Sequence, residues 1–374
     1  MKFIELLRDH LDAFNQAYDG QITSSMRQAI FAMLNCRSNT ERTSQWACRS
    51  CTHTADFPLS CGHRSCPQCQ HNTTTEWLNK QQAKLLPVEY YMVTFTLPYE
   101  LRSVTKHQPE LMYQAMFSVA ASVLKDFAKN SKQLGGDIGF TGVLHTHNRR
   151  RDYHPHIHFI IPAGSFNKHK KQWKKNKGKY LFNAFNLAKV WRARLLAQLA
   201  KLSLKLPSSI PQKWVVDCQH VGKGLPALKY LSRYLYRGVL PDKNIVSNID
   251  GQISFAYLEN HGQNSQTNTT EIRTLPTVEF LWLVLQHVLP KGLRRVRDFG
   301  LLRGGSARLR QRIRLMLAVA GTVFAPLENT TKTQAIRPCP CCRQPMIFMG
   351  VHRNKHARLT SFLRQKPTTP NATV

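Results

Sequence analysis

Three histidines at alternate positions form the strongest chemical pattern in this chain. His154, His156 and His158 belong to the run His-Pro-His-Ile-His-Phe-Ile-Ile. Successive side chains of a β-strand point to opposite faces, so the three imidazoles are expected on one face and the apolar residues on the other. Imidazoles about 7 Å apart along a strand can converge on one metal ion. The spacing therefore predicts a metal site built on a strand.

A second pair of histidines comes just before this strand. His145 and His147 end a run, residues 142–147, that is expected to be the preceding strand. If residues 148–152 form the hairpin turn between the two strands, His145 lies close enough to supply a third ligand. A lone histidine on a strand is usually structural, but alternation over this length favours metal binding.

Two tyrosines one helical turn apart are candidate nucleophiles. Tyr230 and Tyr234 lie in a predicted helix that follows a Gly-Lys-Gly turn, and side chains at i and i+4 share a helix face. Such pairs often serve packing, but Lys223 and Arg233 nearby favour chemistry. A phenol, with a pKa near 10, attacks only when a cation or metal stabilises the phenolate. The combination of metal-binding histidines with nearby tyrosines is suited to transesterification at a phosphodiester.

Paired cysteines predict structural zinc. The thiolates of Cys48-x2-Cys51 and Cys66-x2-Cys69 are expected to complete one tetrahedral site, which leaves no position open for catalysis. The surrounding segment is poor in aliphatic residues and is expected to fold around the metal. Whether a second zinc binds here stays open, because further cysteines and histidines lie nearby: Cys36, Cys61, His53, His63 and His71.

Another cysteine pair stands near the C-terminal end. Cys339-x2-Cys342, followed by His352-x3-His356, has finger-like spacing but few aliphatic neighbours, so metal binding there stays open. The chain is long and most of its 10 cysteines are closely paired, which indicates metal binding in a reducing cytoplasm and not a disulfide framework.

The charge of the chain indicates a polyanionic partner. Lys and Arg total 53 and Asp and Glu 21, a net charge of +32, so nucleic acid is expected ahead of an anionic membrane. The longest apolar run is too short to span a bilayer. Lysines crowd residues 168–179, and residues 291–314 carry nine Lys and Arg against one Asp. The side chains expected to contact DNA are Lys171, Trp173, Lys174, Lys223, Arg233, Arg294, Arg295 and Arg297.

The elements that must position these groups alternate between strands and helices. Hydrophobic patterning predicts strands at residues 90–97, 138–145, 156–162 and 214–220, and helices at residues 4–14, 74–86, 111–127, 180–204, 225–236 and 281–289. A hairpin is expected around Asp250-Gly251. This pattern indicates an α+β fold with a central sheet. Three regions are expected: residues 1–86 with the cysteines, a catalytic domain at residues 87–300, and a basic region with a disordered tail at residues 301–374.

In this order along the chain, the motifs resemble those of a known family. His156-Ile-His158 is similar to the His–hydrophobic–His signature of HUH endonucleases. With Tyr230 and Tyr234, the chain resembles two-tyrosine rolling-circle transposases of the insertion-sequence 91 group, which carry a transposase zinc-binding domain at the N-terminus. Further similarity covers residues 216–224 and residues 280–302. At His147 the chain departs from the family, where an aromatic residue is expected.

The resemblance implies a fold and a mechanism. The fold is an HUH-endonuclease core, a central antiparallel sheet with flanking helices, preceded by a small Cys-rich zinc-binding domain. His156 and His158 would hold Mg²⁺ or Mn²⁺ at the scissile phosphate of single-stranded DNA, with His145 preferred to Gln219 as third ligand. One tyrosine would form a 5′-phosphotyrosine and release a 3′-hydroxyl, and the other would serve the matching strand transfer.

Three other functions would explain only part of these motifs or lack their support. A plasmid replication initiator or relaxase shares the chemistry, but a zinc cluster ahead of the histidine strand favours the transposase. A non-catalytic zinc-dependent DNA-binding regulator leaves the histidines and tyrosines unexplained, and a basic protein of membrane surfaces would need an amphipathic cationic helix. The expected partner is single-stranded DNA of transposon ends and target in the bacterial cytoplasm, at the nucleoid.

Overall fold

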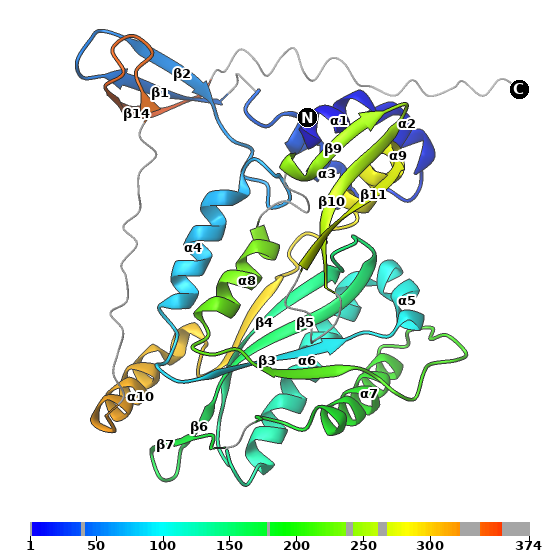
Figure 1. Cartoon of the computed structure of the whole chain (residues 1–374), viewed down its shortest axis with the longest axis vertical. Coiled ribbons are helices and arrows are strands. Elements are labelled where there is room, and N and C mark those ends of the chain that lie inside the picture. The colour runs from blue at the N-terminus through cyan, green and yellow to red at the C-terminus, as the bar shows by residue number, and fades with distance from the viewer. Residues whose placement is uncertain are drawn as a thin grey trace, which may run out of the picture.

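A five-stranded antiparallel sheet lies at the centre of the molecule (Figure 1). The computed structural model describes residues 2–38, 42–177, 180–236, 242–260, 268–321 and 337–353, without the side chains of residues 70–74, 233–236, 259–260 and 268. The strand order is β12-β4-β5-β3-β8. The strands are β3 (Tyr90–Thr96), β4 (Gly139–His147), β5 (Tyr153–Pro162), β8 (Val216–His220) and β12 (Val296–Gly300).

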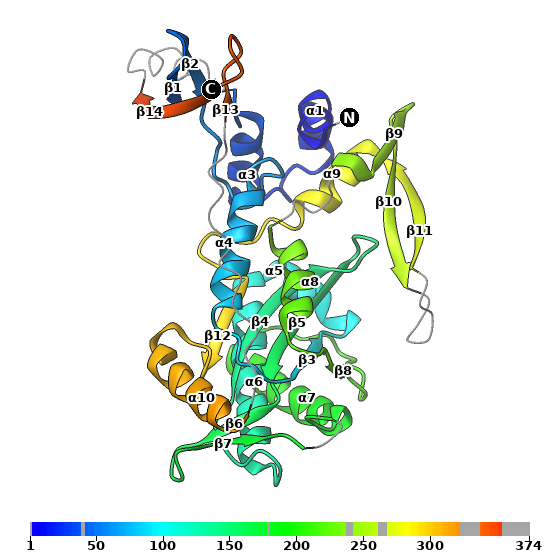
Figure 2. The same ribbon diagram turned by 60° about the vertical axis from the view of Figure 1, so that its left-hand side comes forward.

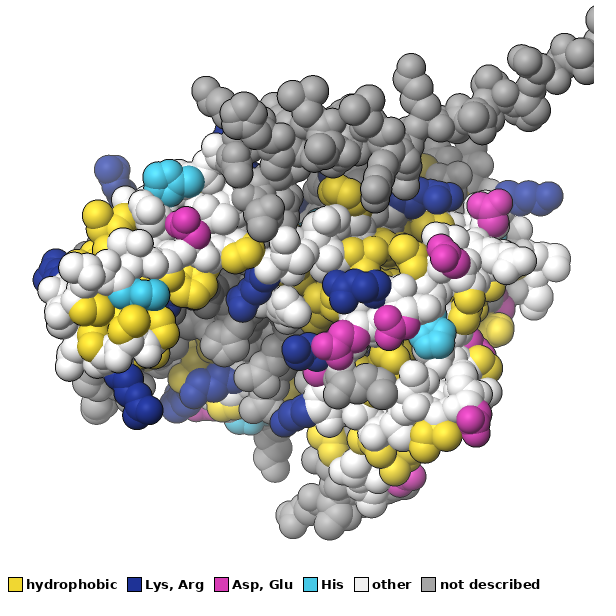
Figure 3. All heavy atoms as spheres, turned by 90° about the horizontal axis from the view of Figure 1, so that it is seen from above, with side chains coloured by type: hydrophobic (Ala, Val, Ile, Leu, Met, Phe, Trp, Pro, Cys, Tyr) yellow, Lys and Arg dark blue, Asp and Glu magenta, His cyan; other side chains and the backbone are white. Residues whose placement is uncertain are grey.

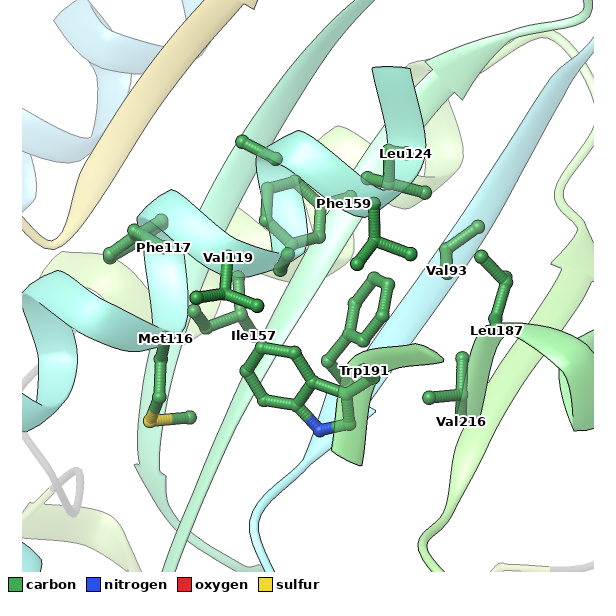
Figure 4. Packing of buried hydrophobic residues seen from close by; sticks show 14 of the residues in the cluster. Val93, Met116, Phe117, Val119, Leu124, Ile157, Phe159, Leu187, Trp191 and Val216 are labelled. Atoms are coloured by element: carbon green, nitrogen blue, oxygen red, sulfur yellow. The ribbon is translucent and has the colours of Figure 1, made fainter. Parts of the chain in front are cut away.

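Two helices cover one face of this sheet and form the largest hydrophobic core (Figure 4). They are α6 (Pro109–Asn130) and α7 (Ala184–Lys201); the shorter helix α5 (Arg102–His107) precedes α6. Alternate residues of β5 point into this core, where Phe159 packs edge-on against Phe95, with ring centroids 5.8 Å apart. Phe95 in turn packs on Trp191 of α7 at 5.1 Å. The even-numbered residues of β5 are thereby directed to the opposite face.

Three helices lie on that opposite face (Figures 1 and 2). They are α4 (Gln70–Gln82), α8 (Leu225–Tyr236) and α10 (Ala307–Val319). From the sheet, Val143 and Ile160 contribute to their shared core, together with Leu228 and Leu231 of α8 and Ile313 of α10. Helix α8 packs along α4 and contacts β4. It is therefore held against the middle of the sheet.

The N-terminal helices form a second body together with a segment from the middle of the chain. Its elements are α1 (Phe3–Asp9), α2 (Leu11–Ala17), α3 (Ser24–Leu34), β9 (Ile245–Ile249), β10 (Gln252–Asn260), β11 (Asn268–Pro276) and α9 (Thr277–Leu285). Phe14, Phe255 and Phe280 are fully buried in one core. Residues on both sides of the expected boundary at 86/87 thus share a single core.

A small sheet pairs strands that follow α3 with the last strands of the described chain. Its order is β13-β14-β1-β2, with β1 (Arg42–Cys48), β2 (Thr54–Pro58), β13 (Arg337–Pro338) and β14 (Pro345–Arg353). β14 pairs antiparallel with β1 from Arg42–Arg353 to Cys48–Met346, with one irregularity after Gln45. A separate hairpin, β6 (Gly164–Asn167) and β7 (Gln172–Lys175), carries many of the lysines of residues 168–179.

The α+β class expected from the sequence, with a central antiparallel sheet and flanking helices, is confirmed. The helix expected at residues 4–14 is instead two helices, α1 and α2, which meet at His10, whose backbone is not helical. Strand β12 lies within the basic segment at residues 291–314 and α10 begins within it, and neither element was expected. Among the described residues, no helix combines the length and apolar character needed to cross a membrane.

Candidate active site and cysteine clusters

The structure brings three of the singled-out histidines together on the face of the sheet that α8 covers. His145 on β4 is the direct cross-strand partner of His156 on β5, and His158 follows two residues later. The ring centroids of His145 and His158 are 4.6 Å apart, and those of His156 and His158 are 4.8 Å apart. One nitrogen from each ring lies within 4.8 Å of the others. Three nitrogen donors so close together could share one cation.

Hydrogen bonds orient two of these rings. Nδ1 of His156 donates to the carbonyl oxygen of His154 at 2.6 Å, which leaves Nε2 as the lone-pair nitrogen of the neutral ring. Nδ1 of His158 is 2.8 Å from Oγ1 of Thr94 on β3, the strand on the other side of β5. Thr94 was not among the residues expected from the sequence. Thr94 alternates with the buried residues Val93 and Phe95, which places it on the histidine face. This alternation is visible in the sequence and could have indicated Thr94.

Burial keeps the three rings neutral at neutral pH. It lowers the pKa of His156 to about 4. Burial, reinforced by neighbouring histidines, also lowers the pKa of His145 and of His158 well below the ordinary value. Neutral imidazole is the form that binds metal. The site therefore needs no proton release from these rings before a cation binds.

We expect Thr94→Val to weaken divalent-metal binding about tenfold, because hydrogen-bond partners of ligating histidines affect metal affinity on this scale. Valine keeps the shape of the side chain and removes the hydroxyl that contacts His158. Titration of the full-length protein with Mn²⁺ measures the effect. Thr270→Val, on an exposed position of β11, is the matched control. Equal affinity for the two variants would show that Thr94 does not position the ligand.

The remaining histidines of the two strands have other contacts. Nδ1 of His154 accepts a hydrogen bond from the guanidinium of Arg102 at 2.5 Å, and His154 is outside the three-histidine cluster. His147 stacks on His287, with ring centroids 3.5 Å apart and planes inclined by 19°. His147 is buried and His287 is half-buried, so in this structure the ring at this unusual position packs against a second imidazole. Gln219, the alternative third ligand, lies on edge strand β8, which β3 separates from β5.

Helix α8 places the first candidate nucleophile on the histidine face. Tyr230 is half-buried and packs against the core that contains Val143 and Ile160. Val143 is the cross-strand partner of His158, and Ile160 is the next residue on that face of β5. Tyr234 lies one turn further along α8, and its side chain and that of Arg233 lie outside the described residues.

The Gly-Lys-Gly turn fixes the start of α8 on the sheet. Gly222 and Gly224 have φ angles of +65° and +83°, which other residues rarely adopt. The N–H of Tyr90 donates to the carbonyl of Gly222 at 2.7 Å, and a Cβ on Gly224 would come within 2.8 Å of the Tyr90 ring. Nζ of Lys223 lies 2.8 Å from Oε1 of Glu89, and this ion pair lowers the pKa of the Glu89 carboxyl group.

The residues expected to contact DNA from the hairpin differ in exposure. Lys171 is exposed in the β6–β7 turn, and Lys174 donates to the carbonyl of Lys132 at 2.7 Å. The half-buried ring of Trp173 lies beside Gly164 and packs against the core that contains Ile313 of α10, and its contact with a base stays a prediction.

The three arginines of the basic segment that were expected to contact DNA also differ in their surroundings. The guanidinium of Arg297 lies 4.4 Å from the centroid of the Phe117 ring, on the face covered by α6. Arg295 donates to the carbonyl of His287 at 3.2 Å. Arg294 lines a pocket of about 350 Å³ that Arg64 also lines, where the Cys-rich segment meets the chain before β12.

The cysteines form two clusters, and their membership differs from the expected one. Cys36, Cys61, Cys66 and Cys69 form the first, with the Cys36 and Cys69 sulfurs 3.4 Å apart. Cys48 and Cys51 belong instead to the second, with Cys339 and Cys342. A single site of Cys48, Cys51, Cys66 and Cys69 is therefore wrong for this structure. The first cluster lies in the core shared by α1–α3 and β10.

Comparisons with known proteins agree with this arrangement of motifs. Residues 139–310 match a family described as "Putative transposase", and residues 6–97 match the family "Transposase zinc-binding domain". The chain is 28% identical to "Putative transposase y4qJ" of Sinorhizobium fredii, over 90% of this chain and 94% of the relative. It is 27% identical to "Transposase for insertion sequence element IS801" of Pseudomonas savastanoi pv. phaseolicola, over 74% of this chain and 70% of the relative.

Solved structures offer a weaker likeness. "Conjugative Relaxase TrwC in complex with OriT Dna. Metal-free structure." is 18% identical over 63% of this chain and 74% of that chain, with a TM-score of 0.28. A metal-bound structure of the same relaxase gives a TM-score of 0.27, with 18% identity over 63% of this chain and 73% of that chain. A TM-score this low carries no argument about function.

The two family matches and the two relatives all carry descriptions of transposases or of a transposase domain. The chain is thus similar to transposases, among them that of insertion sequence element IS801, and its residues 6–97 are similar to a transposase zinc-binding domain.

Proposed function

We propose that this transposase nicks and rejoins single-stranded DNA by transesterification at a tyrosine, in a rolling-circle reaction. The observation that carries the proposal is the cluster of His145, His156 and His158 on the sheet face that also receives Tyr230. A metal-binding cluster beside a phenol is the combination that phosphodiester transesterification needs.

The histidine cluster fits a divalent cation. His145, His156 and His158 would hold the ion as three neutral imidazoles, and an ion with three protein ligands would keep further positions for phosphate oxygens. Imidazole generally favours softer ions than Mg²⁺, and we propose Mg²⁺ or Mn²⁺ by resemblance to the family. When bound, the cation would polarise the scissile phosphate.

The tyrosines would perform the covalent steps. The phenol oxygen of one tyrosine attacks phosphorus, the bond to the 3′ oxygen of the upstream strand breaks, and the phenol proton passes to the released 3′-hydroxyl. The downstream strand is then held as a 5′-phosphotyrosine. The second tyrosine repeats the step on the matching strand, and a 3′-hydroxyl attacking a phosphotyrosine reverses it. Each exchange replaces one phosphodiester with another, so no nucleotide hydrolysis is required.

Strand-specific labelling tests this polarity. Single-stranded DNA from the element's end is labelled at either terminus, incubated with the full-length protein and Mn²⁺, and separated under denaturing conditions. The 3′-labelled downstream fragment is expected to migrate with the protein, and the 5′-labelled upstream fragment to migrate freely. Attachment of the upstream fragment, or hydrolysis without an adduct, would contradict the mechanism.

A relaxase or replication initiator would give the same adduct. A second oligonucleotide carrying the matching end distinguishes them: a transposase is expected to join both element ends to target DNA, whereas these rivals would process one origin. The DNA-binding regulator would give no adduct under any condition.

A further inference from the structure

Two cysteine pairs from opposite ends of the chain meet in the second cluster. The sulfur of Cys48 is 3.4 Å from that of Cys342, and the sulfur of Cys51 is 3.7 Å from those of Cys339 and Cys342. Four sulfurs at the usual zinc–thiolate distance of about 2.3 Å from a central ion would lie about 3.8 Å apart. All four are free thiols, and these separations exceed a disulfide bond of about 2.05 Å.

The backbone of each pair is folded as a tight turn that presents both thiols to the same point. The N–H of Ser50 donates to the sulfur of Cys48 at 3.3 Å. In the other turn, the N–H of Arg343 donates to the carbonyl of Cys339 at 2.8 Å, and Arg343 has a φ angle of +61°. Cys341, inside this turn, is exposed and lies outside both clusters.

The sheet around this cluster has little hydrophobic core of its own. Cys339 and Met346 are buried, but Phe348, Met349 and Val351 of β14 are exposed. Figure 3 shows hydrophobic side chains at the surface of the left-hand lobe, which this sheet forms. Arg337 covers the rings of Trp46 and Phe57 at 5.1 and 4.1 Å. A unit this thin commonly depends on a metal ion for its fold.

We propose that Cys48, Cys51, Cys339 and Cys342 bind one structural Zn²⁺ as four thiolates, separate from the zinc of Cys36, Cys61, Cys66 and Cys69. The ion fastens β14 to β1 and so joins the C-terminal cysteine pair to the N-terminal zinc-binding domain. Neither pair can hold it alone, because each supplies half of the ligands. The inference concerns the module's assembly and does not depend on the nicking chemistry.

Metal counting on the full-length chain, purified under reducing conditions, tests the proposal. Wild-type protein is expected to hold two zinc ions, and Cys339→Ser/Cys342→Ser to hold one. Cys48→Ser/Cys51→Ser should lose the same ion, although its substitutions lie at the other end of the chain. Cys341→Ser is the matched control and should keep both. Two zinc ions in Cys339→Ser/Cys342→Ser, or only one in the wild type, would overturn the proposal.

Hydrogen exchange separates loss of this site from general unfolding. In Cys339→Ser/Cys342→Ser, the amides of β14 and β1 should exchange faster, while those of α6 in the main core stay protected. Protection of β14 equal to wild type would contradict a zinc ion that fastens it. Equal loss of protection in α6 would also contradict the proposal, because it would give these cysteines a role in the whole fold.

Discussion

The double variant Tyr230→Phe/Tyr234→Phe is expected to lose the covalent DNA–protein adduct, with cleavage reduced about 10⁴-fold or more. Phenylalanine at position 230 keeps the ring that packs against the core containing Leu228 and Leu231, and at both positions the substitution removes only the phenol oxygen. DNA binding and the thermal melting temperature should stay close to wild type. Denaturing electrophoresis of labelled DNA and thermal denaturation measure the two quantities.

Single variants and a remote tyrosine complete this experiment. Tyr230→Phe and Tyr234→Phe should each block transposition, because a rolling-circle scheme needs two attacks, but one of them should still cleave in a single turnover. Tyr18→Phe is the matched control, since Tyr18 stacks on Trp282 in the body of the N-terminal helices. An adduct in the double variant would place the nucleophile elsewhere, with Tyr236 examined first. Unfolding of that variant would instead give the pair a packing role.

Loss of the histidine cluster should also stop cleavage, through loss of the metal ion and not of the nucleophile. We expect His156→Ala/His158→Ala to lose divalent-metal binding and to cleave about 10³-fold more slowly or worse, because a metal ion contributes several kcal/mol to such reactions. Added Mn²⁺ should not restore the activity fully. Metal titration and single-turnover cleavage measure both effects.

The controls for this variant separate chemistry from folding. His107→Ala removes an exposed histidine on α5 and should behave as wild type. Both replaced rings are nearly buried, so His158→Gln, which fills more of the space, is the second variant, and it should fold and still fail to bind metal. Normal cleavage by either site variant would exclude the cluster from the reaction.

Much of the catalytic sheet could be predicted from the sequence, because its signals are local. The alternation in β5 sends Ile157 and Phe159 to the core under α7 and the histidines to the other face. The bounds of α8 agree with the predicted helix, since glycines mark its start and apolar residues recur at helical spacing. His145 could be paired with His156 once a short hairpin was assumed.

Pairings between distant segments could not be predicted in this way. Cys48 and Cys342 have nothing in their local spacing that points to each other, and the nearer pair Cys66 and Cys69 offers the same turn. The core that joins Phe14 to Phe255 and Phe280 likewise forms across most of the chain. The packing of the Trp173 ring beside Gly164 is a further contact that the local sequence does not indicate. Such contacts depend on tertiary structure.

Mapping the attachment site of DNA on the wild-type protein tests the central claim most directly. The full-length chain is reacted with single-stranded DNA of the element's end and Mn²⁺, the adduct is digested with nuclease and protease, and the modified peptide is sequenced by mass spectrometry. The account predicts a 5′-phosphonucleotide on Tyr230 or Tyr234 in the peptide from α8. Attachment at a residue outside α8, or cleavage without any modified peptide, would contradict it.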